Sequence, residues 1–95
     1  MLNPISVAFK KAKAEKRPAL LTYTVAGDSS KKQSLDILKS ISKNADILEV
    51  GVPHNTPVAD GSQIQNSAYR AIKKGIKLND IFKIVRDFKK FDKSK

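Results

Sequence analysis

The sequence predicts an α/β fold in one small domain, with two parallel strands and about four helices. Two apolar, β-rich runs, at residues 19–25 and 46–52, are separated by a helix-forming segment, and apolar residues at helical spacing precede the first run and follow the second. A strand, a helix and a second strand in this order form a parallel βαβ unit. A chain of 95 residues allows one such domain. We therefore expect residues 1–95 to form a single domain with a two-stranded parallel sheet.

The first helix is expected over residues 4–15. Asn3 is a good N-cap, and Pro4 suits the first helical position, where no backbone N–H is needed. Pro18 ends the helix. The apolar residues of its inner face recur at helical spacing: Ile5, Ala8, Phe9 and Ala12.

The first strand, residues 19–25, carries no charge, which is typical of a strand covered on both faces. It ends at Gly27, and we interpret Asp28 as a turn and cap residue. Ser29 or Ser30 caps the following helix. That helix places Leu35, Leu38 and Ile41 on one side.

The second strand, residues 46–52, leads into a loop at 53–61, where two prolines and a glycine oppose regular structure and a functional loop is expected. Ser62 is predicted to cap the third helix, which Gly75 stops. Asn79 is predicted to cap the last helix. The apolar stripes of these two helices are Ile64, Ala68, Ala71 and Ile72, then Ile81, Phe82, Val85 and Phe88, and the tail at 91–95 is expected to fray.

The net charge of +10, from 19 Lys and Arg against 9 Asp and Glu, raises the possibility of a nucleic-acid partner. The basic residues fall between apolar positions at helical spacing, which indicates solvated helix faces. No RNP, KH or zinc-finger pattern is present, so specific nucleic-acid binding remains a minor alternative.

Several other classes are excluded or disfavoured by composition. The absence of cysteine excludes disulfides and thiolate sites, and a single histidine, His54, leaves too few ligands for zinc. His54 is interpreted as a hydrogen-bonding loop residue rather than a base. No run approaches the roughly 20 apolar residues of a membrane span, and the N-terminus lacks the pattern of a signal peptide. We expect a cytoplasmic protein without a membrane partner.

Two carboxylates are candidates for acid–base chemistry. Side-chain alternation places Glu49 on one strand face with Ile47 and Gly51, and burial there would raise its pKa toward neutrality. It also lies near the carboxyl end of a parallel strand, where α/β enzymes place their active sites. Asp60 follows in the loop. The alternatives are a structural Glu49 bonded to backbone N–H and an Asp60 that supports a turn or caps a helix.

The motifs around these residues resemble one family closely. The run 49–53, Glu-Val-Gly-Val-Pro, is followed by Pro-Val-Ala-Asp-Gly at 57–61 and Ile-Gln at 64–65, and residues 20–28 fit a first strand with a Gly-Asp turn. Together they resemble the α subunit of tryptophan synthase, the indole-3-glycerol-phosphate aldolase. This sequence differs from the family pattern at two places. Residues 54–56 stand where the family usually has Phe-Ser-Asp, a change that bears on contact with the β subunit. Ser62 stands where the family usually has Pro.

The resemblance implies a (β/α)₈ TIM barrel that cleaves indole-3-glycerol phosphate to indole and glyceraldehyde 3-phosphate. It implies that Glu49 shuttles protons, that Asp60 holds the indole N–H, and that Tyr23 lines the indole pocket. It implies no cofactor, since pyridoxal phosphate belongs to the β-subunit partner.

A closed barrel takes about 250 residues, so we expect an N-terminal fragment with an unclosed barrel that is inactive alone. Its inward residues, Leu21, Tyr23, Ile47 and Glu49, would then lack partners. We expect such a chain to self-associate, as a homodimer or higher oligomer, and a non-catalytic self-associating module is the alternative function.

Overall fold

The computed structural model describes residues 3–54 and 61–95. In chain order the elements are α1 (Pro4–Ala14), β1 (Leu21–Val25), α2 (Lys31–Ile41), β2 (Ile47–Gly51), α3 (Ser62–Lys73) and α4 (Leu78–Phe91). The two strands pair in parallel, with Tyr23 opposite Glu49. The predicted βαβ unit and the expected helices are therefore confirmed, with strands that are shorter than the apolar runs.

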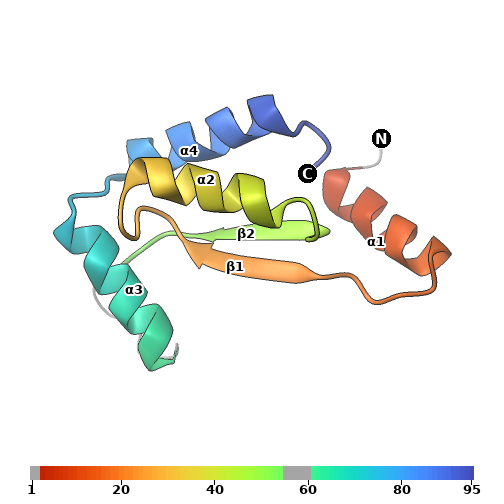
Figure 1. Ribbon diagram of the computed structural model, residues 1–95, viewed down its shortest axis with the longest axis horizontal. Helices are drawn as coiled ribbons and strands as arrows, with labels where there is room; N and C mark the ends of the chain where they lie inside the picture. The colour runs from red at the N-terminus through yellow and green to blue at the C-terminus, as the bar shows by residue number, and fades with distance from the viewer. Residues whose placement is uncertain (1–2, 55–60) are drawn as a thin grey trace.

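One face of the sheet carries the main core. Helices α2 and α4 lie side by side over this face (Figure 1). Leu48 and Val50 of β2 point into the core that these helices form. The buried residues of that core are Ala26, Leu38, Ile81, Ile84 and Phe88. This packing explains why Leu38, on the predicted stripe of α2, is 1% exposed.

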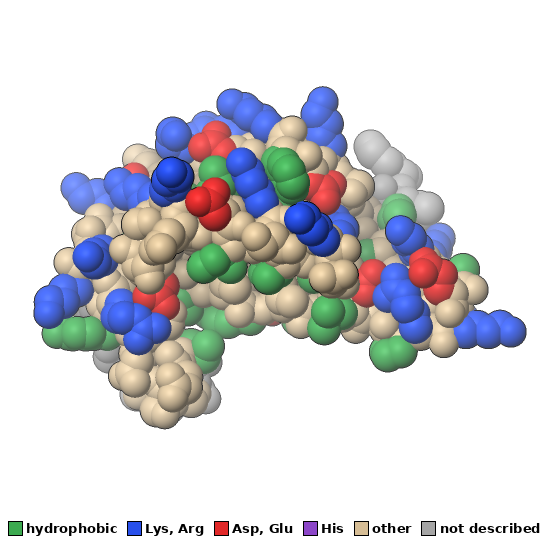
Figure 2. All heavy atoms as spheres, in the orientation of Figure 1, with side chains coloured by type: hydrophobic (Ala, Val, Ile, Leu, Met, Phe, Trp, Pro, Cys, Tyr) green, Lys and Arg blue, Asp and Glu red, His purple; other side chains and the backbone are tan. Residues whose placement is uncertain are grey.

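Except at Val25, which α3 covers, the opposite face of the sheet is open among the described residues. Leu21 and Tyr23 are 52% and 41% exposed, and Glu49 is also exposed. Hydrophobic side chains lie along the underside of the molecule, beneath the strands (Figure 2). The interpretation of the first strand as covered on both faces is wrong for this chain. The expected exposure of the inward residues of an unclosed barrel is confirmed for Leu21, Tyr23 and Glu49. Ile47, the fourth, is half-buried.

Local capping signals are confirmed at three places. The side chain of Asn3 accepts a hydrogen bond from the Ser6 N–H at the start of α1, and that of Ser30 accepts one from Gln33 at the start of α2. Gly75 follows α3 with φ +85°, a left-handed conformation that favours glycine. Each signal acts within a few residues, which is why the sequence reveals it.

Two predicted caps are wrong. The N-cap of α3 is Gly61, so Ser62 is its first helical residue. The N-cap of α4 is Lys77, whose N–H donates to the Asp80 carboxylate at 2.9 Å, and Asn79 lies within the first turn. A carboxylate three residues after the N-cap stabilises the helix start, and this interaction displaces the boundary from Asn79.

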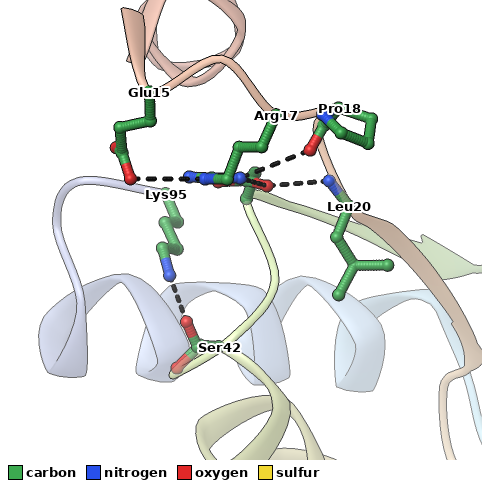
Figure 3. Close-up of polar contacts among 7 residues, drawn as sticks. Glu15, Arg17, Pro18, Leu20, Ser42 and Lys95 are labelled. Carbon is green, nitrogen blue, oxygen red and sulfur yellow. Dashed lines mark hydrogen bonds and ion pairs between the residues drawn. The ribbon is translucent and has the colours of Figure 1, made fainter. Parts of the chain in front are cut away.

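A charged cluster joins the amino ends of the strands (Figure 3). Arg17 donates two hydrogen bonds to the Asp46 carboxylate, at 2.8 and 2.9 Å, and the Leu20 N–H donates a third at 2.7 Å. Glu15 flanks the guanidinium at 3.3 Å. The Arg17 guanidinium holds the pKa of Asp46 well below its usual range. The cluster fixes the connection between α1 and β1 against the start of β2.

Candidate functional site

The middle of the two-stranded sheet brings Tyr23 and Glu49 together. They are register partners in adjacent strands, and both lie on the open face. A Cβ atom added to Gly51 would overlap the Tyr23 hydroxyl, so the tyrosine ring lies over Gly51. Glycine at this position therefore leaves room for the hydroxyl end of the Tyr23 ring.

The other predicted site residues are placed differently. Glu49 is exposed, so the expectation that an apolar environment buries it is wrong for the described chain. Asp60 lies outside the described residues. His54 is exposed and lies three residues after the end of β2. The structure thus joins Tyr23 with Glu49, and their chemical roles remain predictions.

A cavity of about 220 Å³ opens beside Tyr23. Val25 of β1, Asp28 of the following turn, and Ile64 and Ser67 of α3 contribute to its walls, and α2 closes one side through Ser34 and Ile37. Ligand pockets are usually larger than this, about 300–1,000 Å³. A substrate site at this position therefore needs walls in addition to those described.

Asp28 connects the turn after β1 to α3. The Nε and Nη2 atoms of Arg70 each donate to its carboxylate at 2.8 Å, and the Ser67 hydroxyl donates at 2.5 Å. These partners hold the pKa of Asp28 below its ordinary value, the Arg70 hydrogen bonds having the largest effect. Asp28 does lie in a turn, as predicted, but Ser30 caps α2, and the Asp28 side chain binds α3 instead.

Sequence reasoning missed the partners of Asp28. Arg70 is one of the basic residues expected on solvated helix faces. Its separation of 42 residues from Asp28 gives the sequence no local pattern that would pair the two. A signal did exist in the spacing of Ser67 and Arg70, because residues three apart on a helix share a face and can reach one acceptor. Only the fold identifies that acceptor.

Residues 3–54 and 61–95 show neither a metal-binding cluster nor a membrane-spanning helix. These residues contain no group of three or more His, Asp or Glu side chains placed to hold a metal ion. None of the helices they form is both long and apolar enough to cross a membrane. The basic side chains visible in Figure 2 are spread over the outer helices rather than gathered in one patch.

Comparison with known proteins identifies the family. The family model for the tryptophan synthase alpha chain matches residues 9–95. The chain belongs to the tryptophan synthase alpha chain family. The alpha chain of Pelagibacter ubique strain HTCC1062 is 71% identical over 94 residues, which are 99% of this chain and 36% of that relative. The alpha chain of Thermoanaerobacter pseudethanolicus is 44% identical over 85 residues, 88% of this chain and 32% of that relative.

Solved alpha-chain structures share the fold. The Legionella pneumophila alpha subunit superposes with a TM-score of 0.91 at 33% identity, covering 97% of this chain and 36% of that structure. Mutant alpha subunits of Pyrococcus furiosus give 0.74 at 42% identity, covering 76% and 29%. The present chain thus spans about a third of the length of these alpha chains. The prediction of a partial, unclosed TIM barrel is confirmed.

Proposed function

We propose that this chain supplies the proton-transfer part of an alpha-chain active site in tryptophan biosynthesis. The reaction is the retro-aldol cleavage of indole-3-glycerol phosphate to indole and glyceraldehyde 3-phosphate. The observation that carries the proposal is the pairing of Tyr23 with Glu49 on the open face of the sheet. In an alpha-chain barrel this face is the interior, and active sites lie at its carboxyl end.

Glu49 is proposed as the acid and base. It protonates the indole ring carbon, and the bond from that carbon to the glycerol chain breaks. The hydroxyl on the departing glycerol carbon gives its proton to the carboxylate and becomes the aldehyde carbonyl. Asp60 is proposed to hold the indole N–H and to stabilise positive charge on the ring. Tyr23 provides an aromatic wall. No step in this scheme uses a cofactor.

The proposal also explains why isolated residues 1–95 should be inactive. Positioning supplies a large part of catalysis, and the described cavity is too small to bind the substrate completely. Substrate phosphate binding is assigned to parts of the alpha chain outside this sequence, whereas residues 54–56 are assigned to contact with a β subunit. We therefore expect activity when the barrel is completed.

The test uses a completed barrel, in which these 95 residues are joined to the part of the Pelagibacter ubique alpha chain that they do not match. We expect this protein to release indole, and we expect Glu49→Gln and Asp60→Asn each to lower the rate by at least about 100-fold. Asp36→Asn, an exposed carboxylate on α2, is the matched control. Full activity of Glu49→Gln would refute the assignment of Glu49.

A further inference from the structure

We propose that Asp28, Ser67 and Arg70 form a clamp that positions α3 at the carboxyl end of β1, which makes Asp28 and Arg70 positioning residues. The effect on catalysis rests on the proposed function. The clamp itself rests on the geometry of the three side chains and is tested separately.

Apart from these three side chains, α3 has few contacts among the described residues that fix its orientation. It packs on β1 through the small side chains of Ala68 and Ala71 against Val25, with Ile64 and Ile76 at the margin. In Figure 1 it projects past the strand ends, away from the layer formed by α2 and α4. Alanine contacts bring the helix close to the strand but offer few interdigitating atoms to fix its rotation or its slide.

The geometry of the clamp suits it to orient one element against another. Two parallel N–H···O bonds from one guanidinium to one carboxylate define the relative orientation of the two groups, and the Ser67 hydroxyl adds a third contact one helical turn away. The side chains of Asp28 and Arg70 are 23% and 55% exposed. By contrast, the Lys83–Asp87 pair on α4 has a single contact at 3.3 Å and joins residues of the same helix. Of these two pairs, Asp28–Arg70 joins different elements and can fix one against the other, whereas Lys83–Asp87 cannot.

Helix α3 contributes to the cavity beside Tyr23. Its first turn contributes Ile64 to the cavity that includes Tyr23. It begins at Ser62, two residues after Asp60 in the sequence. By fixing α3, the clamp fixes the position of Ile64 in the cavity wall. It also fixes the position of Ser62, two residues after Asp60 in the sequence.

The clamp is tested first on the 95-residue chain by amide hydrogen exchange. We expect Asp28→Asn and Arg70→Lys to accelerate exchange in α3 at least about fivefold more than in α2 and α4. Asp87→Asn, which removes the ion pair within α4, should leave α3 unchanged. Equal exchange in α3 with and without Asp28→Asn would overturn the clamp.

Its catalytic effect is tested in the completed barrel. We expect either substitution to lower kcat/KM about tenfold or more, mainly through kcat, since displacement of groups around the reacting carbon is costly. The double variant should be no worse than the poorer single variant, because both remove one interaction. Asp46→Asn removes the similar bidentate pair at the opposite strand ends and should leave kcat/KM per folded molecule unchanged.

The outcomes separate the two proposals. If the unsubstituted completed barrel releases no indole, the proposed function fails and the positioning role fails with it, while hydrogen exchange still decides the clamp. If that barrel is active and Asp28→Asn keeps its kcat/KM, the positioning role is wrong and the proposed function stands.

Discussion

Gly51 and Tyr23 lie in close steric contact on the open face. Because a Cβ atom at Gly51 would overlap the hydroxyl end of the Tyr23 side chain, Gly51→Ala must displace the ring. We expect this substitution to lower the free energy of unfolding by about 1–2 kcal/mol, and by less than half of that in a Tyr23→Ala background. Urea unfolding of the four proteins measures the coupling, and equal costs in both backgrounds would show that the ring does not lie over Gly51.

The difference between the two sheet faces is testable with leucines. Leu38 is 1% exposed in the core, whereas Leu21 is 52% exposed on the open face. We expect Leu38→Ala to cost about 2–5 kcal/mol because it leaves a cavity, and Leu21→Ala to cost less than about 1 kcal/mol. Thermal unfolding of the two variants would contradict the described faces if their costs were reversed.

At the scale of elements, the capping residues decide where helices begin. Ser30→Ala removes the bond from the Gln33 N–H to the N-cap of α2 and should cost about 1 kcal/mol. Ser62→Ala is the matched control, because Gly61 occupies the N-cap of α3, and it should cost less than about 0.3 kcal/mol. A larger loss for Ser62→Ala in urea unfolding would reinstate Ser62 as the cap.

The ion pairs that join elements predict an acid-sensitive fold. The pKa values of Asp28 and Asp46 are lowered in the folded chain, chiefly by hydrogen bonds from Arg70 and Arg17. Between the folded pKa and the unfolded value of about 3.9, the unfolded chain binds more protons, so a falling pH favours unfolding. These contributions are complete above about pH 5 and are lost progressively below about pH 4.

Melting temperatures at pH 7, 5, 4 and 3 measure this dependence. We expect Asp46→Asn to melt lower than the parent at pH 7 but to lose less between pH 5 and pH 3, because the group that titrates has been removed. Asp36→Asn should follow the parent curve. Parallel curves for Asp46→Asn and the parent would show that Asp46 does not contribute to acid unfolding.

Across the molecule as a whole, the open sheet face and the two strand edges left unpaired among residues 3–54 and 61–95 favour association. Burial of exposed residues such as Leu21 and Tyr23 would stabilise a small core, and the net charge of +10 opposes association until salt screens it. We expect sedimentation at micromolar concentration in roughly 0.15 M salt to show a dimer or larger species. A compact monomer of 10.5 kDa that unfolds cooperatively would contradict this prediction.

The sequence predicts what acts locally. Asn3, Ser30 and Gly75 function within a few residues of their partners, and the two apolar runs suffice to predict parallel pairing. Long-range contacts are different, since the partner of Asp28 lies 42 residues away on another element. The exposure of Glu49 does not follow from the run 46–52, because it depends on what covers the face of the sheet; only the expectation of an unclosed barrel predicted it.

If this chain contributes the Glu49 face of an alpha-chain active site, adding the separate, unmatched part of the Pelagibacter ubique alpha chain to a fixed amount of the 95-residue chain should release indole from indole-3-glycerol phosphate. We expect no release from either piece alone, and release that saturates at one complementary piece per 95-residue chain. With Glu49→Gln we expect release at least about 100-fold slower. Formation of the complex without indole release, or undiminished release with Glu49→Gln, would contradict this contribution of Glu49.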